Sequence, residues 1–287
     1  RWSGCQNIQT ARDCSWGLGG MIASTNDSTA RFTLDPNTRS SQKYLISRVK
    51  VYCHVQDPHA YAIRLITPQG KQAPQRINAL GYVEFYLDQP QEQVSFCLEK
   101  QHPDQNTFTL EGISLENDFR GVQYHAVGVN GATVYSFLKT PKLETHLRSL
   151  EPDLVIVSLG TNDAYTYHFN ADRFKLQLAQ LIQRIKQAAP QASVLLTTPG
   201  DCALPNGGLN TSNQYARAKI LELAEETNSG VWDFFTIMGG LGSVNKWLAE
   251  GMTARDRVHF SGKGYRLQGD LLYDALIQDY ANYQLNR

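Results

Sequence analysis

The sequence predicts two parts of different fold class: an all-β sandwich, followed by an α/β domain with a doubly wound parallel sheet. Two observations support this division. From about Trp16 to Asp118, short apolar or alternating runs are separated by Asp, Pro, Gly and Asn, with no convincing helix. After Gly121, strands alternate with amphipathic helices, which is typical of a parallel sheet. We therefore expect a β domain over residues 1–118 and an α/β domain over residues 119–287, a division that suits a chain of 287 residues.

Each β element of the first part is a run that recurs after ten to twenty residues, as in β-sandwiches. Val, Ile, Tyr and Phe favour pleated, half-buried strands, and the turn residues between the runs end them. The expected strands lie within "YLISRVKVYCHV", "AYAIRLI", "GYVEFYL", "QVSFCLE" and "FTLEGISLE".

The elements of the second part alternate in type. We expect a short strand at residues 124–129, a broken helical stretch at 133–150 and a buried parallel strand at 154–159. A helix with one apolar face follows and ends before Pro190. The remaining expected elements are a strand in "SVLLTTP", a helix over 215–227, a strand in "VWDFF" and a last helix that Ser261 caps.

Charge and hydropathy exclude several classes of function. Lys plus Arg equals Asp plus Glu at 27 each, so no net field draws the chain to nucleic acid or to an anionic membrane. A neutral, sugar-like or ester substrate fits this balance better. No run approaches eighteen apolar residues, so we expect no membrane span.

The five cysteines do not show the paired C-x-x-C spacing of a zinc site, so we expect no metal and no cofactor. Cys5 and Cys14 are close enough to close a small loop. Cys53 and Cys97 lie in strand-like runs where a bridge and two buried thiols are equally compatible with the pattern. Cys202 is then the unpaired thiol, with a structural role.

Three short motifs lie at the ends of expected elements of the α/β part. In "LVIVSLGTND", Asn162 comes just after the carboxyl end of a strand, where open parallel sheets bind their ligands. Its amide can donate to a developing oxyanion, although an isolated "GTND" is more often an Asx-type turn.

In "RDRVHF", Asp256 can reach one imidazole nitrogen of His259 across a tight turn and leave the other as general base. An isolated D-x-x-H is more often a surface ion pair. Gly131 in "VGVNGAT" follows a strand and opens a helix, so its N–H can face the same crevice.

Together and in this order, "GVNGAT", "SLGTND" and "DRVHFSGKGY" resemble the glycine, G-x-N-D and D-x-x-H blocks of the SGNH (GDSL-type) hydrolase family. The resemblance covers residues 121–280 and implies a flavodoxin-like sheet and hydrolysis of esters, often acetyl esters on carbohydrates. It also implies that His259 is the general base, Asp256 its orienting partner, and the Gly131 N–H and Asn162 the oxyanion donors.

The serine of the family's G-D-S motif has no match in this chain. Gly200-Asp201-Cys202 follows a later strand, and Asp27-Ser28 lies in the β half. We expect Ser158 to lie inside a strand and Ser261 to cap a helix, and neither position offers the exposed turn of a nucleophile. The layout resembles the peptidoglycan O-acetylesterase branch, in which a carbohydrate-binding-module-like sandwich interrupts the catalytic domain. On this interpretation the first strand and its serine precede Arg1, the partner is an acetylated polysaccharide, and the protein is bacterial and periplasmic or secreted.

A second hypothesis is a glycan-binding protein with a catalytically inactive SGNH domain. Six aromatic residues of the β half could stack on sugar rings, although aromatics at such alternating positions more often belong to the core. They are Trp2, Trp16, Tyr52, Tyr61, Tyr82 and Tyr86.

Overall fold

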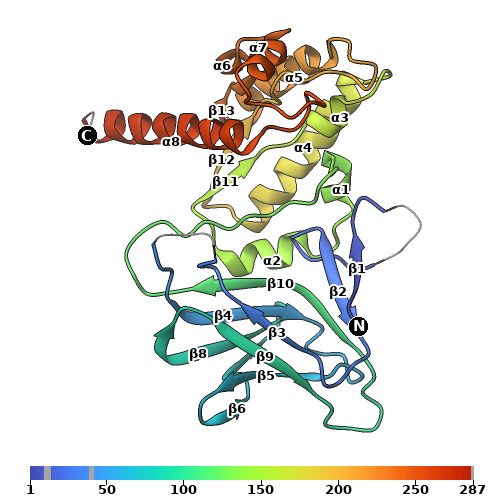
Figure 1. The fold of residues 1–287 in the computed structure, drawn as a ribbon, viewed down its shortest axis with the longest axis vertical. Helices are drawn as coiled ribbons and strands as arrows, with labels where there is room; N and C mark the ends of the chain where they lie inside the picture. The colour runs from blue at the N-terminus through green and yellow to red at the C-terminus, as the bar shows by residue number, and fades with distance from the viewer. Residues whose placement is uncertain (10–13, 39–41, 286–287) are drawn as a thin grey trace. The chain divides into compact units, whose positions relative to one another are not determined.

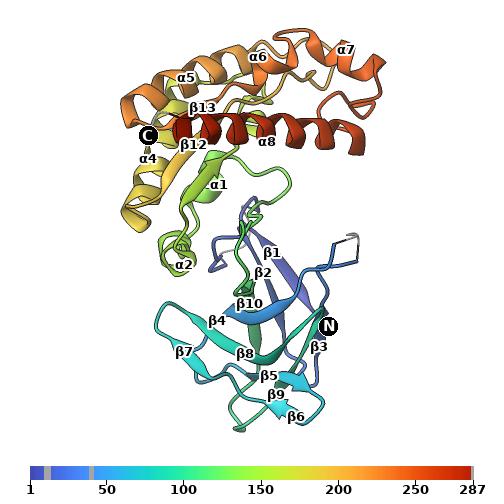
Figure 2. The same ribbon diagram turned by 90° about the vertical axis from the view of Figure 1, so that its left-hand side faces the viewer.

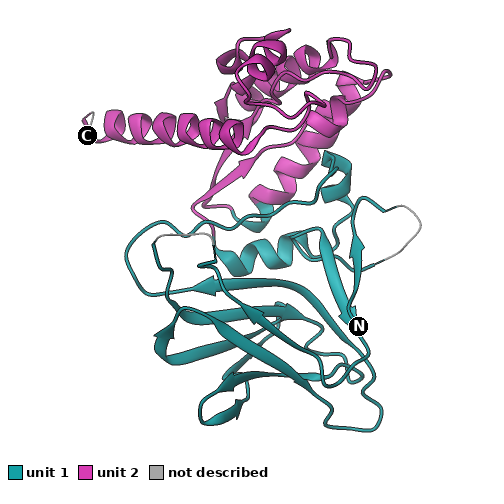
Figure 3. Ribbon diagram, in the orientation of Figure 1, with its two compact units in different colours: residues 1–151, 187–189 teal, residues 152–186, 190–287 magenta. Residues whose placement is uncertain are grey.

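The computed structural model describes residues 1–9, 14–38 and 42–285. These residues form two compact units, coloured separately in Figure 3. The first, called here the β unit, contains residues 1–151 and 187–189. The second, called here the α/β unit, contains residues 152–186 and 190–287.

The β unit is built on two antiparallel sheets (Figure 1). Each expected strand of the β half is present, because alternating apolar residues give each strand one face for the core. The larger sheet has the order β1-β2-β10-β4-β8-β7 and the smaller one β3-β9-β5-β6. The bounds are β1 Ser3–Gln6, β2 Met21–Thr25, β3 Arg31–Leu34, β4 Ile46–Cys53, β5 Ala62–Thr67, β6 Gly70–Gln72, β7 Arg76–Asn78, β8 Tyr82–Gln91, β9 Val94–Glu99 and β10 Phe108–Glu116.

The core of the β unit lies between the two sheets. Val49 and Val51 of β4 and Phe85 of β8, from the larger sheet, are fully buried together with Phe96 of β9 from the smaller sheet. Burial of each such side chain stabilises the fold by about 2 kcal/mol. The predicted sandwich is therefore confirmed, with side chains of both sheets interdigitating in one core.

Two helices complete the β unit: α1 Val134–Leu138 and α2 Leu143–Leu150. They form the predicted broken helical stretch. Thr133 caps α1 by accepting from the Ser136 N–H, and Ser136 caps the Thr133 N–H in return. Helix α2 lies beside the larger sheet (Figure 2). The Tyr52 hydroxyl of β4 is hydrogen-bonded to Ser149 Oγ of α2 at 2.7 Å.

The strand expected at residues 124–129 is wrong, because the structure has no strand there. The segment is apolar enough for a strand, but none of the three sheets includes it. A strand exists only when its backbone groups pair with a neighbour. Without one, Val122 is 97% exposed and Tyr124 80% exposed.

The α/β unit has a parallel sheet of order β11-β12-β13, with β11 at one edge. The strand residues are continuous apolar runs, as the sequence predicted for this sheet type. The bounds are β11 Leu154–Val157, α3 Thr161–Ala164, α4 Ala171–Ala188, β12 Ser193–Thr197, α5 Ser212–Thr227, β13 Gly230–Trp232, α6 Phe234–Met238, α7 Ser243–Ala249 and α8 Gly262–Leu285.

The strand expected over "VWDFF" is only partly right. Strand β13 ends at Trp232, and Asp233 caps α6 by accepting from the Thr236 N–H at 3.4 Å. Asp233 also forms an ion pair with Arg217 of α5 at 2.7 Å. A side chain that supplies a helix cap ends the strand early, so Phe234 packs from a helix rather than from the sheet.

Helix α8 begins as predicted at a serine cap, with the Gly264 N–H donating to Ser261 Oγ at 3.2 Å. Its Leu271, Leu272 and Ala275 pack against Trp232 and Phe234. On the same helix, Tyr273, Tyr280 and Leu285 are more than half exposed. No helix within the described ranges combines the length and apolarity that a bilayer crossing requires.

The cysteines resolve the alternatives left open by the sequence. Cys5 and Cys14 form a disulfide. Cys53, Cys97 and Cys202 are buried free thiols.

Candidate active site

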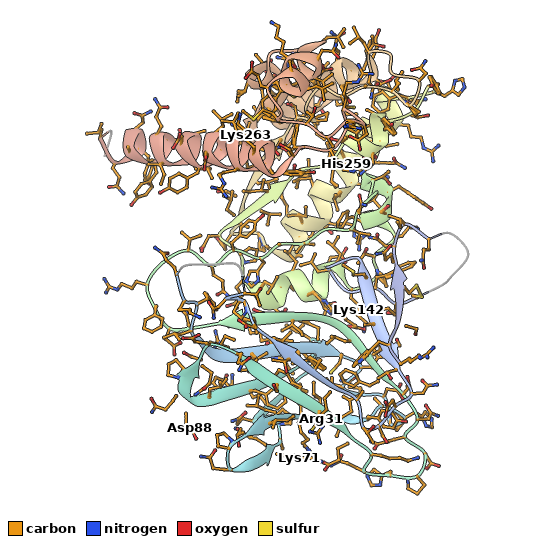
Figure 4. The ribbon with its side chains drawn as sticks, viewed as in Figure 1. Arg31, Lys71, Asp88, Lys142, His259 and Lys263 are labelled. Carbon is orange, nitrogen blue, oxygen red and sulfur yellow. A yellow bond between two sulfur atoms is a disulfide. The ribbon has the colours of Figure 1, made fainter. Side chains whose placement is uncertain are left out.

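Asp256 and His259 face each other on the turn that precedes α8. The Asp256 Oδ2 atom lies 2.8 Å from His259 Nδ1, and Oδ1 accepts from the backbone N–H groups of Val258 and His259 at 2.9 and 3.0 Å. Figure 4 shows His259 near the start of α8, where Lys263 lies. The expected D-x-x-H turn is therefore present in the predicted geometry.

This arrangement keeps Asp256 ionised and orients the imidazole of His259. The Val258 N–H and the His259 side chain lower the pKa of Asp256 to about 2, so the carboxylate is ionised at any ordinary pH. An ionised carboxylate can only accept, so Nδ1 donates to it, and in the neutral form of the imidazole Nε2 then keeps a lone pair. His259 can thus serve as a general base through Nε2. Its side chain is 57% exposed and that of Asp256 50% exposed.

Asn162 lies on the short helix α3, directly after β11. Gly160 turns the chain from strand to helix with φ 121°, a conformation that residues with a Cβ rarely adopt. The Ala164 N–H closes the turn on the Gly160 carbonyl at 2.8 Å. Asn162 is exposed at the carboxyl end of the strand, where an open parallel sheet places its ligand site.

A loop of residues 202–210, called here the connecting loop, joins the Asn162 turn to the His259 turn. Asn210 is fully buried, and its side-chain amide donates to the Ala164 carbonyl of α3 at 3.1 Å. At the other end of the loop, the Ala203 N–H donates to the Arg257 carbonyl at 3.0 Å. The structure therefore attaches both predicted functional turns of the α/β unit to one loop.

Three contributors to this region were missed by sequence reasoning: Asn210, Arg257 and Tyr165. Burial raises the pKa of the Tyr165 phenol, and the charges of Cys202 and Asp256 raise it further. An isolated Asn in a loop and the variable positions of D-x-x-H carry no sequence signal. Tyr165 could have been suspected, because it comes three residues after Asn162.

Gly131 belongs to the β unit, and the other three candidates belong to the α/β unit. It has φ 82° and precedes the α1 cap, with the Ala132 N–H donating to the Val129 carbonyl at 3.0 Å. The expected glycine turn before a helix is present. Its role as an oxyanion donor stays a prediction.

The serine and cysteine candidates also have definite places. Ser158 is one residue past the end of β11, not inside the strand as expected, and it is exposed. Its Oγ accepts from the Thr197 hydroxyl at 2.9 Å. Cys202 is 2% exposed, and its Sγ accepts from the side-chain amides of Asn210 and Asn213. Burial raises the pKa of the Cys202 thiol, so "GDC" is a packed loop rather than a nucleophile.

Most of the aromatic residues that could stack on sugars are core residues. Trp16, Tyr52, Tyr61 and Tyr82 are less than a tenth exposed, whereas Trp2 is 37% exposed. Buried aromatic rings cannot stack on a sugar, so this distribution weakens the hypothesis that the sandwich binds glycan through these residues. No group of three or more His, Cys, Asp or Glu residues in the described part of the chain is arranged to hold a metal ion.

The β unit has a cavity of about 420 Å³ with a buried carboxylate in its wall. Glu111 Oε1 contacts Lys142 Nζ and lies 2.8 Å from His54 Nε2, and Oε2 lies 3.3 Å from His146 Nε2. Figure 4 labels Lys142, at the start of α2. Burial favours a raised pKa for Glu111, but the close contacts with His146, His54 and Lys142 outweigh it and lower the pKa to about 2. Neither His54 nor His146 was given a role from the sequence.

Comparison with known proteins identifies the family of the chain. A family model, the GDSL-like Lipase/Acylhydrolase family, matches residues 110–267, more than half of the chain. No curated protein matches the sequence at a significant level.

Among solved structures, a peptidoglycan O-acetylesterase aligns with a TM-score of 0.79 and 20% identity, over 97% of this chain and 75% of its own. A lipase/acylhydrolase from Enterococcus faecalis aligns with a TM-score of 0.42 and 24% identity, over 51% of this chain and 71% of its own. The first of these covers both units and shows a common fold. The match over residues 110–267 includes all three motif blocks, and the chain belongs to the GDSL-like Lipase/Acylhydrolase family, also known as SGNH hydrolases.

Proposed function

We propose that this chain is part of a serine esterase that removes O-acetyl groups from a polysaccharide, with peptidoglycan as the favoured substrate. The observation that carries the proposal is the Asp256–His259 pair, in which Nδ1 of His259 faces the carboxylate and Nε2 is the other ring nitrogen, in a chain of the acylhydrolase family. The fold shared with a peptidoglycan O-acetylesterase over 97% of the chain supports the choice of substrate.

The proposed reaction has two halves. In the first, His259 Nε2 takes the proton of a serine hydroxyl while the serine oxygen attacks the acetyl carbonyl. The amide of Asn162 and the N–H of Gly131 stabilise the oxyanion, and His259 returns the proton to the departing sugar oxygen. In the second, His259 activates water, which attacks the acetyl-enzyme and releases acetate and the serine. Asp256 remains ionised throughout and holds the tautomer.

The nucleophilic serine is proposed to lie outside residues 1–287, on a strand that pairs with the open edge of β11. Two observations support this placement: β11 is an edge strand of a parallel sheet, and Leu154 on it is 41% exposed. Parallel sheets are normally covered on both faces, and an uncovered edge strand offers unpaired backbone groups to a further strand. We also propose that residues 119–287 form the catalytic domain and residues 1–118 an inserted sandwich with its lead-in.

A periplasmic or secreted location forms part of the proposal. The Cys5–Cys14 disulfide supports it, because disulfides persist in oxidising compartments.

Hydrolysis of p-nitrophenyl acetate tests the function and the position of the serine together. Residues 1–287 alone should turn over the ester slowly, whereas a protein that also carries the proposed serine strand should turn it over rapidly. In that longer protein, His259→Ala should abolish turnover and Ser158→Ala should leave it unchanged. A serine-directed probe such as a fluorophosphonate, followed by peptide mass spectrometry, identifies the nucleophile. Labelling of any serine within residues 1–287, or turnover that survives His259→Ala, would contradict the proposal.

The natural substrate is tested by acetate release. O-acetylated peptidoglycan and acetylated xylan are offered at equal acetyl concentration, and acetate is measured enzymatically. The proposal expects a higher kcat/KM on peptidoglycan, and a preference for xylan would overturn that choice while leaving the esterase function standing.

A further inference from the structure

Arg257, between Asp256 and His259, has a backbone conformation that arginine rarely adopts. Its φ is 55°, in the left-handed region. The only other non-glycine residues with positive φ in the described part of the chain are Glu151 and Asn228. Those two end helices α2 and α5, where a left-handed residue is a common terminator. Arg257 ends no helix, so the strain there needs another cause.

The left-handed residue makes the compact turn on which the Asp256–His259 contact depends. Asp256 Oδ1 reaches forward past residue 257 to the N–H groups of Val258 and His259, while Oδ2 reaches the imidazole. The Arg257 N–H donates back to the Ala254 carbonyl at 3.0 Å. Glycine would adopt this conformation without strain. An arginine at this position therefore indicates that the contacts of its side chain offset the backbone strain.

The guanidinium of Arg257 bridges two segments outside the turn. Its Nη1 donates to Asn245 Oδ1 of α7 at 2.9 Å, and its Nη2 donates to the Gly207 carbonyl of the connecting loop at 2.8 Å. A Cβ added to Gly207 would come within 2.8 Å of Nη2, so the guanidinium lies close against the loop backbone. The Arg257 carbonyl also accepts from the Ala203 N–H. The residue is therefore attached to the connecting loop twice and to α7 once.

We propose that Arg257 is a positioning residue, whose guanidinium clamps the Asp256–His259 turn to the connecting loop and to α7. The planar fork of arginine suits this use because it donates in two directions from one rigid group. Since Asn210 of the same loop holds α3 through the Ala164 carbonyl, the clamp also sets the His259 turn relative to the Asn162 turn. Its effect on catalysis rests on the proposed function, whereas its effect on the imidazole does not.

The clamp matters because the pair that it holds is open to solvent. Asp256 and His259 are each about half exposed, so water competes for the carboxylate and for Nδ1. An exposed contact between two side chains contributes too little free energy to fix the conformation of the turn by itself. An external anchor removes the alternative turn conformations in which Nδ1 faces water.

The first test reads the imidazole directly. The protein is labelled with ¹⁵N-histidine, and the ring nitrogen shifts of His259, assigned with His259→Gln, are recorded at a pH where the ring is neutral. The original protein should show the Nδ1–H tautomer. Arg257→Gly, which keeps the turn accessible but removes the fork, should show a mixture with the Nε2–H tautomer. Arg255→Ala removes an exposed arginine two residues earlier and should change nothing.

The second test reads catalysis in the protein that carries the nucleophilic serine. Arg257→Gly should lower kcat on p-nitrophenyl acetate by about 30-fold with KM within about threefold, since misplacing a catalytic group costs up to about 100-fold. Arg257→Lys keeps the charge but not the fork and should restore less than half of the lost kcat. Asn245→Ala, which leaves the backbone of the turn untouched, should cost about threefold.

The outcomes separate the clamp from a merely structural role and from the proposed function. A structural role predicts that Arg257→Gly lowers the unfolding temperature while the tautomer and kcat stay unchanged, and that result overturns the proposal. If Arg257→Gly shifts the tautomer while His259→Ala leaves ester turnover intact, the clamp stands and the proposed function fails. If the tautomer is insensitive to both Arg257→Gly and Asn245→Ala, the clamp is wrong even where His259 proves essential.

Discussion

At the scale of single residues, the proposed reaction depends on the Asp256 Oδ2 atom that faces His259 Nδ1. Replacing Asp256 by Asn puts an amide opposite His259 Nδ1, and an amide that donates there selects the wrong tautomer. We expect Asp256→Asn to lower kcat of the serine-bearing esterase by about 10⁴-fold. Its free energy of unfolding should fall by less than about 1 kcal/mol, because the ion pair is half exposed.

The pH dependence of the same residue follows from its lowered pKa. The folded-state pKa of Asp256 is about 2, below its ordinary value of 3.8, so its stabilising contribution is present above pH 4 and is lost as the pH falls toward 2. Titration of Asp256 therefore cannot produce a fall in activity between pH 8 and pH 5. A pH–rate profile and a urea titration measure the two effects. An orienting role is contradicted if the loss of kcat in Asp256→Asn, expressed as a free energy, is no larger than its loss of unfolding free energy.

The sequence predicted these site residues to different degrees, for physical reasons. Asp256 and His259 interact across three positions, so their geometry is local and a short motif contains it. Arg257 acts through Asn245 and Gly207, which are twelve and fifty residues away, and no spacing rule brings them together. Ser158 was expected inside a strand because an apolar run does not mark where pairing stops. Gly131 and Asn162 each appeared as a turn residue, a role that sequence alone assigns more easily than catalysis.

At the scale of elements, the turn after β11 depends on a glycine. Gly160 has φ 121°, and a Cβ at this position would lie 3.4 Å from Phe174 Cζ and 3.6 Å from Pro199 Cδ. Those are ordinary van der Waals distances, so we expect Gly160→Ala to lower the free energy of unfolding of the α/β unit by about 2 kcal/mol through the backbone strain of a positive φ alone. It should also lower kcat by misplacing Asn162.

A matched substitution in the same unit should act in the opposite direction. Gly269 lies within α8, where an added Cβ meets nothing within 4 Å. Gly269→Ala should raise the free energy of unfolding by about 1 kcal/mol through helix propensity. Both changes are measured by urea denaturation. Equal and small effects at the two positions would show that Gly160 is not conformationally required.

The predicted elements succeeded where the pattern was local and failed where pairing was required. Helix α4 was expected from its apolar face and from Pro190, and both signals lie within the segment itself. The strand at 124–129 failed because a strand also needs a neighbour, and hydrophobicity alone cannot supply one. The end of β13 was misjudged because Asp233 is used as a helix cap and as the partner of Arg217.

At the scale of the whole molecule, the β unit contains a buried ionic cluster that the proposed reaction does not use. We expect its contribution to the free energy of unfolding to be lost at low pH. The side chain of Glu111 is fully buried, and its pKa is lowered from 4.5 to about 2 by contacts from His146, His54 and Lys142 that outweigh burial. The unfolded chain binds a proton at Glu111 more readily than the folded protein does. Its contribution is therefore present above about pH 4.5 and is lost as the pH falls toward 2.

Glu111→Gln should thus lower the free energy of unfolding at pH 7 by about 3 kcal/mol, because it leaves Lys142 and two imidazoles around a neutral amide. The variant should also lose less stability than the original protein between pH 4.5 and pH 2. Glu92→Gln is the control, since the Lys43–Glu92 pair is a surface pair with both side chains more than half exposed, worth less than about 1 kcal/mol. Urea titrations at pH 7, 4.5 and 3 measure all three proteins. Replacing a buried carboxylate that contacts three basic side chains should destabilise the fold more than replacing a solvated carboxylate. If Glu111→Gln and Glu92→Gln lower the free energy of unfolding equally at pH 7, the buried cluster does not stabilise the β unit electrostatically.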